Sequence, residues 1–145
     1  MTIFEERVNT KGSVLFIVLT HILATVYGIA FIIAGISHFR SPQIFADIVP
    51  TFLPFPLFLV YLTGVMEIAG GIGIIHPDTR VLTGRFLVLF LIAVFPANLY
   101  MWIADVPFNG SLLTTPQHML RFVVQIVLII TAIFLSGDLQ RFRTT

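Results

Sequence analysis

The dominant pattern in the chain is a set of long apolar runs separated by short polar segments. A helix needs about 20 apolar residues to cross roughly 30 Å of hydrocarbon. Runs of this length cover about 13–37, 56–75, 81–103 and 119–136. They are continuously apolar rather than alternating, which excludes a transmembrane β-barrel. The pattern therefore predicts a single transmembrane domain over residues 1–145, an all-α integral membrane four-helix bundle.

The first run also resembles a cleaved signal peptide, because it follows Arg7 and Lys11 near the N-terminus. Its apolar stretch is longer than the roughly 7 to 15 residues of a signal-peptide core, and Glu5 and Glu6 lie in the segment before it. No small-residue cleavage site follows at the right distance. We therefore interpret this run as a membrane-spanning helix.

Composition agrees with a membrane protein. Hydrophobic residues make up 57% of the chain, charged residues make up 10%, and the mean hydropathy is +1.01. Soluble domains carry about 25% charged residues. The net charge is only +1, so no basic patch indicates nucleic acid, and the expected environment is the lipid bilayer.

The absence of cysteine excludes several kinds of chemistry. Disulfide exchange, thiol-based quinone reduction, iron–sulfur ligation and cysteine-ligated zinc all require thiolates. The four histidines, His21, His38, His76 and His118, form no pair at i, i+3 or i+4. We therefore expect neither a metal site nor a haem site.

Cations at the helix ends predict the orientation, because cytoplasmic loops are enriched in Lys and Arg. With four spans, one side of the membrane holds Arg7, Lys11, Arg80, Arg85, Arg141 and Arg143. The other side holds Arg40 and Arg121. Both termini are therefore expected in the cytoplasm, an N-in/C-in arrangement of a multi-pass protein.

The first outer loop, 41–56, is rich in proline and apolar residues. Ser41 and Pro42 are suited to begin a short helix. On such a helix the apolar residues share one face: Ile44, Phe45, Ile48 and Val49. We predict a short interfacial helix that either closes the bundle as a lid or rests on the membrane as a connector.

Glu67 is the only acidic or basic residue in the run Pro56–Ile75. A rise of 1.5 Å per residue places it roughly 17 Å from one end of the run and roughly 12 Å from the other, close to the bilayer midplane. Ionisable groups at that depth pair with another group or have a function. Arg85 lies at matched depth beyond a tight turn, so a structural Glu67–Arg85 ion pair is one candidate.

Other polar residues gather toward the expected outer leaflet. Tyr27 and His38 share a stripe on the first helix, Arg121 and Gln125 share one on the fourth, and Asn98 lies near the outer end of the third. Together with Glu67 as the floor, these residues form a candidate pocket for a ligand. For Arg121 taken alone, its place near the bilayer edge favours a side chain that extends to lipid headgroups.

Two further features concern packing. The small residues Thr20, Ala24 and Gly28 recur every fourth position, and the second run is rich in glycine, as expected at close helix–helix contacts within the bundle or in a dimer. Pro96 removes an amide from the third helix and predicts a kink. Asn98 either repairs the lost hydrogen bond or faces a cavity.

A succession of short motifs resembles the DoxX-like family of small bacterial membrane proteins. The motifs are Ser37-His38-Phe39, Ile48-Val49-Pro50, Leu53-Pro54, Thr63-Gly64, Glu67, Gly70-Gly71, Thr79-Arg80 and Val94-Phe95-Pro96-Ala97-Asn98 with Met101. They span about 35–101. The resemblance implies a four-helix protein of the bacterial inner membrane. It assigns no catalytic residue, and the cysteine pair of the redox-maturation relatives is missing here.

Three functions remain open. The family includes a membrane subunit associated with a quinone-reducing thiosulfate oxidoreductase, so the resemblance favours a subunit or structural partner of a larger assembly, such as a redox complex. The pocket favours a binding or redox site for a quinone-like or other small apolar ligand. A proton-coupled transporter would require a homo-oligomer. No cofactor is required, a quinone would fit, and the sequence does not decide whether the protein is an enzyme.

Overall fold

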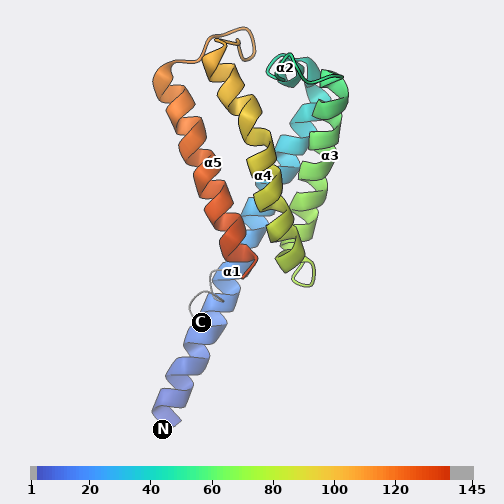
Figure 1. The fold of residues 1–145 in the computed structure, drawn as a ribbon. Helices are drawn as coiled ribbons and strands as arrows, with labels where there is room; N and C mark the ends of the chain where they lie inside the picture. Colours follow the sequence, from blue (N-terminus) through green and yellow to red (C-terminus); the bar gives the residue numbers. More distant parts are fainter. Residues whose placement is uncertain (1–2, 138–145) are drawn as a thin grey trace.

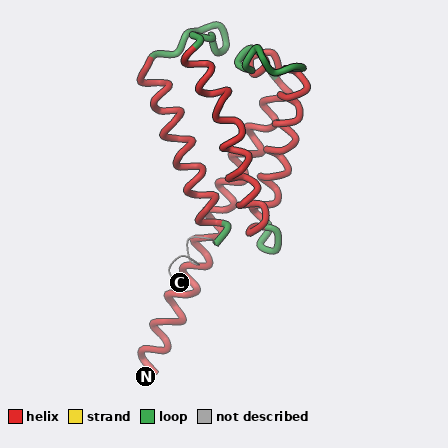
Figure 2. Tube along the Cα trace, viewed as in Figure 1, coloured by secondary structure: helices red, strands yellow, loops and turns green. Residues whose placement is uncertain are grey.

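The computed structural model describes residues 3–137, which form five helices (Figure 1). They are α1 (Ile3–Arg40), α2 (Pro42–Ala46), α3 (Pro56–Ile75), α4 (Arg80–Ile103) and α5 (Thr115–Leu135). Turns and loops join the helices, and no strand occurs within the described range (Figure 2). Every helix except α2 is long and apolar enough to cross a membrane. The prediction of an all-helical chain with four candidate membrane spans is confirmed.

The first and last long helices begin earlier than their apolar runs. At 1.5 Å per residue, the 38 residues of α1 extend about 57 Å, well beyond the roughly 30 Å of a hydrocarbon core. Its candidate membrane span is Ser13–Arg40. α5 starts at Thr115 rather than Met119, because the Thr114 N–H donates to Gln117 Oε1 at 2.7 Å and so caps the first turn.

The long helices form two pairs. α1 packs along α3, α5 packs along α4, and contacts between α3 and α4 join the pairs. The pairs meet near the α3–α4 turn and diverge toward the end that carries α2 and the α4–α5 loop (Figure 1). We call these ends the turn end and the loop end.

Paired glycines bring the backbones of α1 and α3 into contact. Gly28 lies against Gly71, and Gly35 lies against Gly64 one heptad further along both antiparallel helices. A Cβ atom on Gly71 would lie 2.5 Å from the Gly28 carbonyl oxygen, and one on Gly35 would lie 2.6 Å from the Gly64 oxygen. The small-residue faces therefore serve contacts inside the bundle, where lipid supplies no hydrophobic drive between helices.

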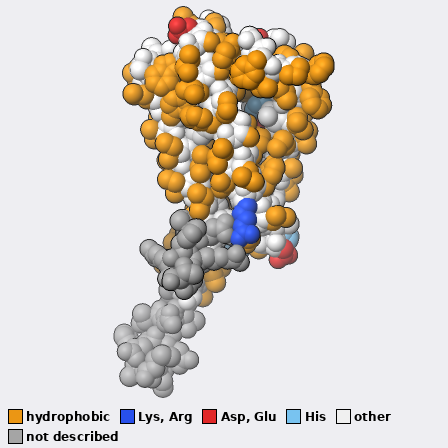
Figure 3. Space-filling model, in the orientation of Figure 1, with side chains coloured by type: hydrophobic (Ala, Val, Ile, Leu, Met, Phe, Trp, Pro, Cys, Tyr) orange, Lys and Arg blue, Asp and Glu red, His pale blue; other side chains and the backbone are white. Residues whose placement is uncertain are grey.

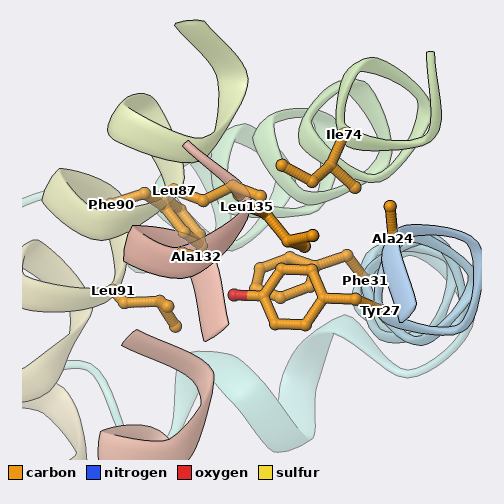
Figure 4. Packing of buried hydrophobic residues seen from close by; sticks show 9 residues of the cluster. All are labelled: Ala24, Tyr27, Phe31, Ile74, Leu87, Phe90, Leu91, Ala132 and Leu135. Atoms are coloured by element: carbon orange, nitrogen blue, oxygen red, sulfur yellow. The ribbon is translucent and has the colours of Figure 1, made fainter. Parts of the chain in front are cut away.

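The apolar core lies between the two helix pairs on the turn-end side (Figure 4). Its buried members are Ala24, Tyr27, Phe31, Ile74, Leu87, Phe90, Leu91, Ala132 and Leu135. The Tyr27 hydroxyl donates to the Leu128 carbonyl oxygen at 2.8 Å, which ties α1 to α5. Without this bond, the Tyr27 hydroxyl would be buried in the core with no hydrogen-bond partner.

Arg80 closes the α3–α4 turn. Its side chain is 8% exposed, and it donates from Nε to the Ile74 carbonyl at 3.0 Å and from Nη2 to the Ile75 carbonyl at 2.9 Å. These carbonyls end α3 and have no amide partner within the helix. A cation at this position also opposes the partial negative charge of the helix C-terminus.

Hydrophobic side chains cover most of the visible face of the bundle, and the charged side chains in this view lie at its two ends (Figure 3). Large apolar residues are exposed on every long helix, including Val26 at 63%, Leu82 at 74% and Leu89 at 69%. Soluble monomers rarely expose such continuous apolar surface. The arrangement suits a bundle whose solvent is lipid.

The glycine contact predicts a stability effect. We expect Gly71→Ala to reduce the free energy of unfolding in detergent by about 1–3 kcal/mol, because the new methyl group meets backbone that cannot move aside. Thermal unfolding followed by circular dichroism measures this change. Ala69→Val, which enlarges an exposed residue on the same helix, is the matched control. Equal stability of both variants would contradict close α1–α3 packing.

Candidate ligand-binding cavity

Two adjoining cavities occupy the space where the helix pairs diverge. The roofed cavity, about 450 Å³, lies beneath α2 and the loop that follows it. The lateral cavity, about 420 Å³, lies between α1, α4 and α5. Both are lined by Ala34, Glu67, Phe90, Val94, Asn98 and Arg121. The polar side chains of the sequence-predicted site thus stand at the junction of two mainly apolar cavities.

Helix geometry brings Glu67 to His38. Each residue lies three positions beyond the Gly35–Gly64 contact on its own helix, roughly 4.5 Å along the axis. Because side chains lean toward the N-terminus of their helix and α1 and α3 are antiparallel, the two side chains lean toward each other. His38 Nδ1 lies 3.0 Å from Glu67 Oε2, and both side chains are largely buried.

The same histidine nitrogen also contacts backbone. His38 Nδ1 lies 2.9 Å from the Ala34 carbonyl oxygen, which can only accept, so the proton resides on Nδ1 and is donated to Ala34. The same nitrogen lies 3.0 Å from Glu67 Oε2 but carries one proton for two acceptors. Oε2 is therefore buried beside a polar neighbour with its hydrogen-bonding capacity unused.

A second polar group crosses from α4 to α5. Arg121 Nη2 donates to Asn98 Oδ1, and Asn98 Nδ2 donates to Gln125 Oε1 at 2.9 Å. Gln125 Nε2 then donates to the Leu91 carbonyl oxygen at 2.7 Å. Each member orients the next, so the guanidinium is held at the cavity by a connected series of hydrogen bonds.

Aromatic residues cover the polar groups from the loop end. Phe45 of α2 stacks on the His38 ring, with centroids 4.0 Å apart. Phe45 also meets Phe108 of the α4–α5 loop edge-on at 5.9 Å, and the Arg121 guanidinium carbon lies 5.4 Å from the Phe108 ring centroid. The roof therefore links both helix pairs above the cavity, and the arginine gains a cation–π contact.

Glu67 and Arg121 are the acidic and basic residues that line the cavities. No ion pair joins them among residues 3–137: Glu67 contacts His38, and Arg121 bonds to Asn98. An acceptor at one wall and a guanidinium with further N–H donors at another can both hydrogen-bond to a molecule between them. The low local dielectric strengthens such bonds.

The structure brings together most of the sequence-predicted site. His38, Glu67, Asn98 and Arg121 line the roofed cavity, and Gln125 lines the lateral cavity. Tyr27 lines neither cavity and belongs to the core instead, because it points toward Leu128 on α5. The Arg121 side chain lines both cavities and lies against the ring of Phe108.

The proposed Glu67–Arg85 pair is not formed. Depth alone suggested it, but at 100° per residue Arg85 lies about 140° around α4 from Phe90, which faces the cavities. Arg85 is accordingly exposed, and His38 occupies the place beside Glu67. Similar depth on neighbouring helices therefore did not imply that the two side chains face each other.

The structure shows which of its two predicted roles Asn98 has in α4, the third predicted membrane helix. α4 remains continuous through Pro96, and Asn98 bonds to Gln125 and Arg121, so it faces the cavity and does not repair the backbone. Gln125 supplies a donor to α4 backbone near the proline, at Leu91. The contact between Phe45 and Phe108 was missed, because nothing in the sequence signals contacts between distant loops.

The site offers few metal ligands. Across residues 3–137, no group of three or more His, Asp or Glu side chains gathers in one place.

Comparison with known families identifies one match. A family model described as "Domain of unknown function (DUF8561)" matches residues 27–136. The chain belongs to this family. The matched segment includes every residue named above as lining the cavities, whereas the first turns of α1 lie outside it. No curated protein matched the chain, and no solved structure matched it.

Gln125 provides a test of the hydrogen-bonded series formed by Arg121, Asn98 and Gln125. We expect Gln125→Leu to destabilise the protein by about 1–3 kcal/mol, because Asn98 loses a partner inside the bundle. Chemical or thermal unfolding in detergent measures the loss. The control is Thr131→Val on the same helix, whose hydroxyl is exposed and bonds within its own helix. An unchanged midpoint for Gln125→Leu would contradict a structural role of the series.

Proposed function

We propose that the protein is a membrane-embedded binding protein for a small, mainly apolar molecule with hydrogen-bonding oxygens, best matched by a quinone. The observation that carries the proposal is the pair of apolar cavities with Glu67 and Arg121 at their junction. Ligand sites typically enclose about 300–1,000 Å³ and combine apolar walls with a few polar groups. Both cavities fall within that range.

The hydrogen-bonding groups suit both forms of a quinone. A carbonyl oxygen can accept from the Arg121 guanidinium, which uses only part of its five N–H groups on Asn98. A hydroxyl of the reduced form can donate to the Glu67 carboxylate, which lines both cavities. Glu67 and its neighbour His38 both line the roofed cavity, which supports a role of this pair in binding.

Arg121 gives the most direct test. We expect Arg121→Met to weaken binding of decylubiquinone about 10- to 100-fold, the loss typical of one charge-assisted hydrogen bond. Native mass spectrometry of the purified protein, titrated with the quinone, measures the bound fraction. Arg85→Met is the matched control, because Arg85 lines neither cavity. Equal binding by both variants, or no quinone bound by the wild type, would overturn the proposal.

A second candidate function is that of a subunit in a larger membrane assembly. On α1, the consecutive residues Val14–Leu19 are all exposed, so this part of the helix is apolar on every side. Lipid alone can cover it, but so can helices of a partner protein or of a second copy. This role agrees with the DoxX-like resemblance of 35–101 and with a place in the bacterial inner membrane. It does not conflict with ligand binding.

We further propose that the loop end faces outward and that both termini are cytoplasmic, as the distribution of Lys and Arg indicates. Phe52 and Phe55, in the loop between α2 and α3, are 76% and 75% exposed. Exposed aromatic rings at one end of a bundle suit the membrane–water interface. They support an interfacial position for α2 and its loop, which also roof the cavity.

Because the chain lacks cysteine, single cysteines can report this orientation. We expect Ser111→Cys, in the α4–α5 loop, to react with a membrane-impermeant maleimide on intact spheroplasts. We expect Asp78→Cys, whose native side chain is 89% exposed in the α3–α4 turn, to react only after lysis. The opposite labelling pattern would reverse the proposed orientation.

A further inference from the structure

We propose that the ligand has a long hydrocarbon tail and that this tail leaves the lateral cavity between α1 and α5 into the lipid. The inference deepens the proposed function and rests on it. It assigns the polar head of the ligand to the junction of the cavities and its tail to the lateral cavity. The ligand class is therefore an amphiphile with a compact oxygen-bearing ring, such as a long-tailed quinone.

The two cavities adjoin at shared polar residues. They share Glu67, Asn98 and Arg121, so a head bonded to these groups borders both spaces at once. Beyond the junction, the lateral cavity is lined on α5 by Leu120, Val124 and Leu128 and on α1 by Ala30 and Phe31. These residues present hydrocarbon, which suits a tail and offers no partner to a polar extension of the ligand.

The mouth of the lateral cavity lies on the lipid-facing surface. Leu120 is 62% exposed and Val124 is 47% exposed although both line the cavity, and Ala30 across the gap on α1 is also exposed. In a bundle surrounded by lipid, such residues border the hydrocarbon phase. A tail that follows them passes from the cavity into lipid without meeting water.

The helices leave this mouth open. α1 packs mainly on α3, and α5 packs mainly on α4, so the two helices that flank the mouth do not pack along each other. Two side-chain contacts join these helices toward the turn end: the Tyr27–Leu128 hydrogen bond and the edge-on contact of Phe16 with Phe134. The helices also diverge toward the loop end (Figure 1).

The roof blocks the other direction. Ile48 is 8% exposed, Pro50 is fully buried, and Phe45 and Phe108 meet above the polar groups. A long tail cannot pass through this packed layer without displacing it. A molecule much larger than about 450 Å³ therefore has to leave the bundle sideways, and the lateral mouth offers such a path.

The test compares two quinones on two matched variants. Val124 and Val123 are adjacent on α5 and similarly exposed, at 47% and 56%, but only Val124 lines the cavity. The probes are decylubiquinone and the tail-less 2,3-dimethoxy-5-methyl-1,4-benzoquinone, each titrated against purified protein in the same detergent. Native mass spectrometry gives the dissociation constant of each.

We expect Val124→Phe to weaken decylubiquinone binding about tenfold, equivalent to about two methylene groups losing their apolar contact. Binding of the tail-less quinone should stay as in the wild type, and Val123→Phe should change neither probe. Unchanged decylubiquinone binding by Val124→Phe, or an equal loss for both probes, would overturn the lateral path. If the wild type binds neither quinone, the proposed function itself fails and the lateral path fails with it.

Discussion

The close approach of α1 to α3 at two glycine pairs is the constraint on which the site depends. Gly28 against Gly71 and Gly35 against Gly64 bring carbonyl oxygens to within about van der Waals distance of the opposing backbone. At that separation a histidine and a glutamate placed just beyond the contact lean into one another. A side chain at any of these glycines would push the helices apart and separate His38 from Glu67.

The arrangement of the helix pairs also leaves a space between them. α3 and α4 join the pairs near the turn end, where Leu87 packs on Gly70 and Arg80 closes the turn. Away from that end the pairs diverge, and the volume is bounded by the α2 roof and the α4–α5 loop. The fold thus concentrates its packing at one end and leaves room for a ligand at the other. Small residues allow the close packing at the turn end, and the long segment between α1 and α3 roofs the space at the loop end.

The polar groups on the two sides of the cavity differ in how many of their hydrogen bonds are formed. Arg121, Asn98 and Gln125 form a connected series that ends on backbone, whereas Glu67 meets a histidine whose proton is directed at Ala34. The acidic wall therefore retains an unused acceptor, and the basic wall retains unused donors. Such groups are costly at membrane depth, and their retention around an open cavity supports the proposal of a ligand site over that of a structural ion pair.

The sequence by itself determined the features that depend on local composition and on the spacing of apolar residues. Continuous apolar runs specified four candidate spans, the proline-rich loop specified a short helix after Ser41, and Glu67 stood out because it is charged among apolar neighbours. Depth along a helix also followed from the rise per residue. That was enough to gather His38, Glu67, Asn98, Arg121 and Gln125 as one candidate site.

Only the tertiary structure decided which side chains face one another. Arg85 and Glu67 share a depth but not a direction, because the rotation of α4 is set by its packing on α3 and α5. Tyr27 shares a stripe with His38, yet its hydroxyl reaches Leu128 in the core. The roof formed by Phe45 and Phe108 joins two loops far apart in sequence. Helix rotation and loop contact arise from packing between distant segments, which local sequence pattern does not encode.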